Sequence, residues 1–136
     1  MRAISNAVRS CIAVICPTVW DRDELTRLER RTAVTFTTFP PEVRGLGDTF
    51  ATLVTRFRLR NATRFVDRAA TACRTAGARG IFSTDDDIGA AVAAAVAERM
   101  SLPSASVAAV LHAQNKLLCR RLVSQLHPDA TPHFAA

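Results

Sequence analysis

Residues 11–16, with the sequence Cys-Ile-Ala-Val-Ile-Cys, constrain the fold of this chain more than any other stretch. All six side chains are apolar, and Pro17 ends the run. A continuous apolar run of this length is typical of a strand that is buried on both faces, as in a parallel sheet. Parallel strands need crossover connections, which usually contain a helix. The run therefore predicts an α/β fold.

Two further segments have the composition of strands. Residues 33–39 are rich in β-branched and aromatic side chains, and Pro40 and Pro41 follow them. Residues 79–83 form a shorter segment directly after a predicted helix. Between these strands, residues 40–61 contain turn-forming glycines and a stretch that fits either a helix or a strand.

Helical patterns alternate with the strands. The first is a short helix that runs to Arg31, for which Asp21 or Asp23 is the expected N-cap and Leu25 and Leu28 the expected inward-facing residues.

Two more helices are predicted before residue 101. Apolar residues between 65 and 73 recur at helical spacing, and Gly77 supplies a C-terminal stop. Residues 88–100 are rich in alanine, the best helix former. Strands that alternate with helical crossovers predict a small Rossmann-like parallel sheet flanked by helices.

A long last helix is predicted over residues 106–126, with Ser104 or Ser106 as its N-cap. Val107, Leu111, Leu118 and Leu122 lie on one face of it and are expected to pack on the rest of the domain.

Lys116, on the same helix, is the only lysine of the chain. It lies roughly 150° around the helix from the apolar stripe, facing solvent or a ligand. An exposed lysine on an exposed helix is the ordinary interpretation, and a phosphate contact is the alternative, since an ammonium binds phosphate as a compact charge.

Length and net charge bear on the number of domains and on nucleic-acid binding. The 136 residues suffice for one domain with a core. The net charge is +6, but the arginines are spread along the chain, and their densest cluster, Arg56 to Arg64, has no nucleic-acid motif around it. Charge alone is a weak sign of nucleic-acid binding, so an anion- or nucleic-acid-binding protein that uses this cluster is only a third alternative, behind those given below.

The four cysteines have no CxxC or zinc-finger spacing, which predicts free thiols in a reducing compartment and no metal site. Apolar runs are too short for a signal peptide or a membrane span, so a cytoplasmic, soluble protein is expected.

The ends of the strands are where an α/β sheet binds ligands. No GxGxxG or P-loop pattern follows the first strand, and no nucleophile motif accompanies the histidines. Asp85, Asp86 and Asp87 follow the third strand. Such acids could orient an amine substrate or bind a divalent cation. Alternatively they cap the following helix and interact with its dipole.

The order of these segments resembles the front of an ATP-grasp ligase. The residues that carry the resemblance are Val-Ile-Cys-Pro-Thr-Val-Trp at 14–20, Gly-Ile-Phe-Ser-Thr-Asp-Asp at 80–86, the helix at 91–100, Leu102-Pro103, Ala-Gln-Asn-Lys at 113–116, Arg120-Arg121 and Ala-Thr-Pro-His-Phe at 130–134. In that superfamily a Rossmann-like pre-ATP-grasp domain ends with a helix and a Leu-Pro-Gly turn, and a lysine-bearing helix then leads into the catalytic domain.

The resemblance implies a function. Family members use ATP and Mg²⁺ to activate a small carboxylate as an acylphosphate, which an amine or similar nucleophile attacks. It also implies that Lys116 contacts an ATP phosphate. Asp85 and Asp86 are candidate substrate-binding residues by their position alone, with helix capping as the alternative. On this basis residues 1–103 are the pre-ATP-grasp domain and residues 104–136 an incomplete start of the ATP-grasp region.

Two departures from the family pattern qualify this expectation. Ser101 and Ser104 stand where glycines usually flank the Leu-Pro pair. The glycine-rich phosphate hairpin and the metal-binding glutamates and asparagine of the family do not occur in this sequence. We therefore expect an N-terminal fragment that is inactive alone, does not bind ATP tightly, and has a downstream ATP-grasp domain or a second copy as its partner. The alternative is a stand-alone, non-catalytic Rossmann-like binding module.

Overall fold

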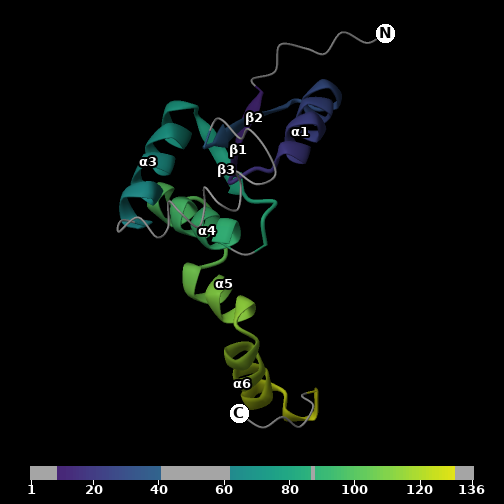
Figure 1. Ribbon diagram of the computed structural model, residues 1–136, viewed down its shortest axis with the longest axis vertical. Coiled ribbons are helices and arrows are strands. Elements are labelled where there is room, and N and C mark those ends of the chain that lie inside the picture. Colours follow the sequence, from purple (N-terminus) through teal and green to yellow (C-terminus); the bar gives the residue numbers. More distant parts are fainter. Residues whose placement is uncertain (1–8, 41–61, 87, 131–136) are drawn as a thin grey trace.

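A computed structural model describes residues 9–40, 62–86 and 88–130. Predictions for residues 41–61, for Asp87 and for the tail from residue 131 lie outside this part of the chain. The three predicted strands are confirmed as β1 (Ser10–Ile15), β2 (Val34–Phe39) and β3 (Ala78–Phe82). They form a parallel sheet in the order β2-β1-β3, with β1 in the centre (Figure 1).

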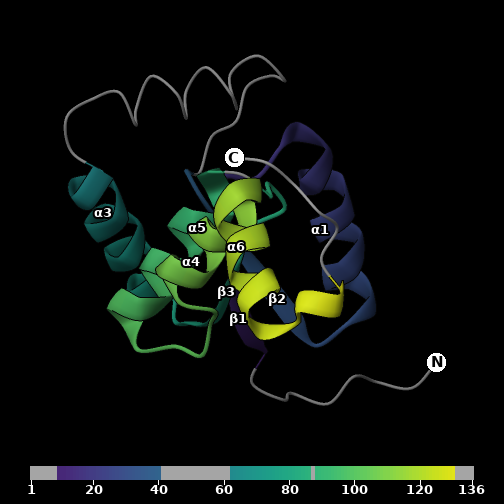
Figure 2. The same ribbon diagram turned by 90° about the horizontal axis from the view of Figure 1, so that it is seen from below.

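The helices cover both faces of this sheet. Helix α1 (Val19–Arg31) joins β1 to β2, and α3 (Ala62–Thr75) precedes β3, which leads into α4 (Ile88–Met100). Because the chain leaves β1 toward β2 and later returns past β1 to β3, right-handed crossovers place α1 on one face and α3 on the other. Figure 2 shows this arrangement, with α4 on the same side as α3. The fold is α/β and consistent with the predicted small Rossmann-like sheet.

The core lies mainly between β1 and the helices α3 and α4. Ala13 and Ile15 are fully buried and pack with a cluster of small and β-branched residues from both helices, namely Val66, Ala69, Ala70, Cys73, Val92, Ala93 and Val96. The opposite face is covered more thinly, because α1 buries Leu25 but leaves Leu28 44% exposed. The prediction that both leucines face inward is therefore half wrong.

Specific residues at the helix ends account for where α1 begins and where α3 and α4 end. The N-cap of α1 is Thr18, which corrects the prediction of Asp21 or Asp23. Gly77 ends α3, as predicted, and it adopts the left-handed conformation, with φ of 67°. Ser101 does the same after α4, with φ of 55°, and the Leu102 N–H donates to the Ala97 carbonyl across the turn at 3.0 Å.

The predicted helix over residues 106–126 is two helices, which corrects the single continuous helix. Helix α5 (Val107–Gln114) begins at the predicted cap Ser106, and α6 (Lys116–Leu126) follows after Asn115. The Oδ1 atom of Asn115 accepts hydrogen bonds from the N–H groups of Leu117 and Leu118, each at 3.1 Å. The side chain thus replaces two backbone acceptors, and the helix breaks there. A short 3₁₀ turn, η1 (Pro128–Ala130), follows.

The two last helices extend away from the sheet (Figure 1). The predicted packing of the apolar stripe on the domain is not observed: Leu111, Leu118 and Leu122 are 50%, 38% and 47% exposed. Neither helix has a buried residue.

Candidate functional site

The candidate site lies beyond the carboxyl ends of β1 and β3. The chain proceeds from β1 to one neighbour and later to the other, so the crossovers diverge between these two strands. In open α/β sheets this point is where ligands bind. The segments that meet here are residues 16–21, after β1, and residues 83–86, after β3.

A carboxylate joins the two segments. Asp21 Oδ2 accepts hydrogen bonds from the Thr18 N–H at 2.5 Å and from the Thr18 hydroxyl at 2.8 Å. It also accepts from the Thr84 hydroxyl, at 2.6 Å, which comes from the other side of the site. Asp21 therefore satisfies the first turn of α1 and at the same time ties that turn to the end of β3.

A second carboxylate holds the start of α4. Asp85 Oδ2 accepts from the Gly89 N–H at 2.7 Å, and the Asp85 N–H donates to Ser83 Oγ at 3.1 Å. The Ser83 hydroxyl donates in turn to the Ile15 carbonyl at 2.7 Å, so this chain of bonds reaches the end of β1. For Asp85, the capping alternative is therefore the one the structure supports.

Gly89 is required by this close packing. A Cβ atom built on it would lie 2.4 Å from Ser83 Oγ and 2.8 Å from Asp85 Cβ. Only a residue without a side chain lets the first turn of α4 approach the loop after β3 so closely.

Asp86 and Lys116 lie on the same side of the molecule. The Gln114 Nε2 atom donates to the Asp86 carbonyl at 2.8 Å and so attaches the end of α5 to the loop after β3. Asp86 is exposed, and Lys116 is the exposed first residue of α6, two positions beyond Gln114. Figures 1 and 2 show α5 and α6 beneath the carboxyl edge of the sheet. The structure thus places Asp85 and Asp86 at the carboxyl edge of the sheet, and Lys116 two residues after the Gln114 side chain that contacts this edge.

The polar groups of the site bind one another rather than form an open cluster of ligands. Among the residues that the structure describes, no group of three or more His, Cys, Asp and Glu side chains could hold a metal ion. All four cysteines are free thiols. Burial raises the pKa of the Cys73 thiol, and the nearby Cys11 raises it further. Cys73 lies in the core on α3, away from the candidate site.

The sequence placed Thr18, Ser83 and Thr84 at the ligand-binding ends of the strands, but it did not predict the hydrogen bonds that these residues make. Hydroxyl residues are common in turns, and their spacing gave no signal of a shared site. The signal that was available is position: each stands within three residues of the end of β1 or β3, which the strand assignment had already located.

Comparison with protein-family models, with curated proteins and with solved structures found no match to this chain. In the described ranges, none of the helices is long and apolar enough to span a membrane.

Proposed function

We propose that this chain is the N-terminal, pre-ATP-grasp part of an ATP-grasp ligase, which activates a small carboxylate with ATP for attack by an amine. The catalytic ATP-grasp domain would be supplied by polypeptide beyond residue 136 or by a second chain. The free thiols of all four cysteines are consistent with a cytoplasmic location, which is part of the proposal.

The observation that carries the proposal is the hydrogen bond between Gln114 and the Asp86 carbonyl. It holds the start of the lysine-bearing helix at the carboxyl edge of the sheet, where a ligand-binding site is expected. A phosphate held by Lys116 would then lie on the same side as the ends of β1 and β3.

Two further features support the proposal. The leucines of α5 and α6 remain exposed, as expected of helices that a catalytic domain would cover. Ser101 adopts the left-handed conformation that favours glycine, at the position where the family pattern has a glycine.

The residues present fit only part of the family's nucleotide site. Lys116 has an exposed ammonium that suits a phosphate oxygen. When bound, Mg²⁺–ATP supplies the activating phosphoryl group. The described residues contain no group of metal ligands for it, so we assign the metal to the catalytic domain and give this chain no step that involves it.

The test begins with the coding sequence that follows the codon for Ala136, read in all three frames. The expected result is a glycine-rich hairpin followed by paired glutamates and an asparagine. The protein that contains this chain followed by the encoded downstream region is then assayed for release of ADP that requires both a carboxylate and an amine. We expect Lys116→Ala to lower this activity about a hundredfold, whereas Arg30→Ala, which removes an exposed charge from α1, leaves it within about twofold.

Two results would overturn the proposal. One is a downstream sequence without these features, combined with no ATP-grasp protein that completes the chain when co-expressed with it. The other is a joined enzyme whose ADP release is indifferent to Lys116→Ala. Either result would favour a stand-alone binding module, and a stable homodimer through α5 and α6 would identify the second copy as the partner.

A further inference from the structure

Helix α6 exposes a row of leucines. Leu118, Leu122 and Leu126 are spaced by four residues, so they lie on one side of the helix and form what we call its leucine face. All three side chains are exposed, and Leu126 is 65% exposed. Neighbouring exposed leucines of this kind mark a surface for contact with another domain or molecule.

The leucine face is open to a partner. Figure 1 shows α6 beyond α5, extending away from the sheet. Helix α6 contacts its own chain through α5 and η1. Its half-buried residues are Cys119, Val123 and Ser124, none of which belongs to the leucine face. The contacts that hold α6 in place therefore leave the leucines accessible.

Positive charge borders the leucine face. Residues 107–126, which span α5 and α6, contain three lysine and arginine residues and no aspartate or glutamate. The next acid along the chain, Asp129, lies beyond the end of α6. Arg121 is one helical turn beyond Leu117 and Leu118, at the edge of the face. It is exposed, and no ion pair within the described ranges includes it.

This combination of leucines and positive charge selects among possible partners. A second copy of the chain would bring cations together, because both halves of a symmetric interface present the same residues, and like charges across an interface are unfavourable. A purely apolar surface would cover the leucines but leave the Arg121 guanidinium without a counter-charge at the rim. Carboxylates beside an apolar groove match both features.

We propose that the partner surface of α6 is an apolar groove edged with carboxylates, and that the ATP-grasp catalytic domain supplies it. This inference rests on the proposed function and adds the chemistry of the partner that the function requires. The leucines would enter the groove as anchors spaced by about one helical turn. A carboxylate at the rim would accept hydrogen bonds from the guanidinium of Arg121.

The probe is a peptide with the sequence of residues 115–127 in which Lys116, Arg120 and Arg121 are replaced by glutamate. The control peptide keeps the sequence of the chain, so the two peptides present the same leucines with opposite charge. Each is titrated under reducing conditions into the ¹⁵N-labelled full chain, and amide chemical shifts report binding. We expect the acidic peptide to give saturable shifts in α6, with a dissociation constant in the millimolar range. The control peptide should bind about tenfold more weakly, and added salt should reduce this difference.

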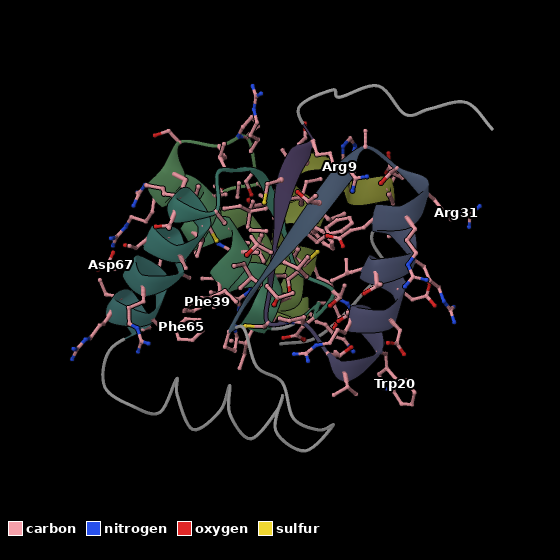
Figure 3. The ribbon with its side chains drawn as sticks, turned by 90° about the horizontal axis from the view of Figure 1, so that it is seen from above. Arg9, Trp20, Arg31, Phe39, Phe65 and Asp67 are labelled. Atoms are coloured by element: carbon pink, nitrogen blue, oxygen red, sulfur yellow. The ribbon has the colours of Figure 1, made fainter. Side chains whose placement is uncertain are left out.

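Variants of the full chain test the leucines and the charge separately. Leu122→Ala should weaken binding of the acidic peptide about tenfold. Its control is Leu28→Ala on α1, since Leu28 and Leu122 are 44% and 47% exposed. Arg121→Ala should weaken binding about fivefold. Its control is Arg31→Ala, because Arg31 is exposed and points outward from α1 (Figure 3). Both controls should bind as the parent does, and the amide spectrum of each variant reports whether it is folded.

Four results would overturn this proposal. The first is an absence of saturable shifts in α6, and the second is unchanged affinity in folded Leu122→Ala or Arg121→Ala protein. The third is a control peptide that binds as tightly as the acidic one, which would identify a second copy or a purely apolar partner. The fourth is binding of the full chain to phosphatidylglycerol vesicles that Leu122→Ala abolishes, which would identify a membrane surface.

The peptide titration is independent of the test of the ligase proposal, because it contains neither ATP nor a downstream domain. A ligase whose activity requires Lys116, together with a chain that does not distinguish the two peptides, would overturn only the inference about the partner surface. Selective binding of the acidic peptide, without a downstream or co-expressed ATP-grasp domain, would overturn the ligase proposal and the assignment of the groove to that domain.

Discussion

The hydroxyl of Thr84 donates to Asp21 Oδ2 at 2.6 Å and thereby joins the end of β3 to the first turn of α1, across 63 positions of the sequence. The same carboxylate oxygen accepts from the N–H and hydroxyl of Thr18. One side chain thus fixes the geometry on both sides of the candidate site. Its contribution to stability and its effect on the site are therefore coupled.

Replacing Asp21 by asparagine tests this coupling. Asp21→Asn removes the negative charge that these donors and the α1 dipole favour, so the free energy of unfolding should fall by about 1–2 kcal/mol. The measurement is urea denaturation at neutral pH. The control is Asp23→Asn in the same helix, where the carboxylate is exposed and the change should stay within about 0.5 kcal/mol. Equal losses in both variants would contradict the bridging role of Asp21.

Gly89 provides a second test at the site. Alanine normally stabilises a helix relative to glycine by about 1 kcal/mol. At this position the added Cβ would meet Ser83 Oγ at 2.4 Å, so Gly89→Ala should instead destabilise the protein by about 1–3 kcal/mol in urea denaturation. Gly80→Ala is the matched control, because its Cβ would approach Ile12 no closer than 3.8 Å. A Gly89→Ala protein as stable as the parent would mean that the loop after β3 moves aside freely.

The three strands could be predicted because their signals are local. The apolar run of β1 and the β-branched composition of β2 describe each strand without reference to its neighbours. The exposure of Leu28 could not be predicted, because α1 covers the less populated face of the sheet, where Leu25 is the one residue of α1 that is buried. How much of a helix face is buried depends on the residues that it packs against. The spacing of apolar residues within the helix does not specify them.

The candidate site was predicted in place but not in composition. Asp85 can be recognised as a site residue because acids before a helix form a visible pattern, although that pattern alone leaves capping and ligand binding both open. The partnership of Thr84 with Asp21 depends on the strand order β2-β1-β3, which no short-range pattern contains. The break at Asn115 was missed for a different reason. Asparagine is tolerated within helices, and only its hydrogen bonds to the next turn show that it has replaced the backbone.

Ser101 offers a stabilising substitution. Its φ of 55° costs a residue with a Cβ atom more than it costs glycine. Ser101→Gly should therefore raise the free energy of unfolding by about 0.5–1 kcal/mol, even after the larger unfolded-state entropy of glycine is counted. Ser104→Gly, three residues later, should bring no gain, since Ser104 does not have a positive φ. Equal effects of the two variants in thermal or urea denaturation would contradict the backbone argument.

Asn115 separates α5 from α6, which begins at Lys116. Asn115→Ala removes the acceptor for the Leu117 and Leu118 N–H groups, at a cost of about 1 kcal/mol if the break remains. Alanine also favours a helical backbone, which restores carbonyl acceptors to these groups. We therefore expect α5 and α6 to fuse, and ¹³Cα secondary shifts at position 115 to become helical. Asn115→Asp keeps the cap and should keep the break. Non-helical shifts at position 115 in the alanine variant would show that tertiary contacts, rather than the cap, impose the break.

The buried thiol of Cys73 predicts how stability depends on alkaline pH. Burial, assisted by the nearby Cys11, raises the pKa of Cys73, so the folded state holds the proton more tightly than the unfolded state does. The stabilisation is complete below the unfolded pKa, near 9, and is lost as the pH rises through the folded pKa. Urea midpoints of the parent should therefore fall faster above pH 9 than those of Cys73→Ala, once the constant offset from the missing sulfur is subtracted.

The control is Cys119→Ala, which removes a half-buried thiol from α6 and should retain the steep fall of the parent. Parallel pH profiles for the parent and Cys73→Ala would mean that Cys73 ionises as readily in the folded chain as in the unfolded one.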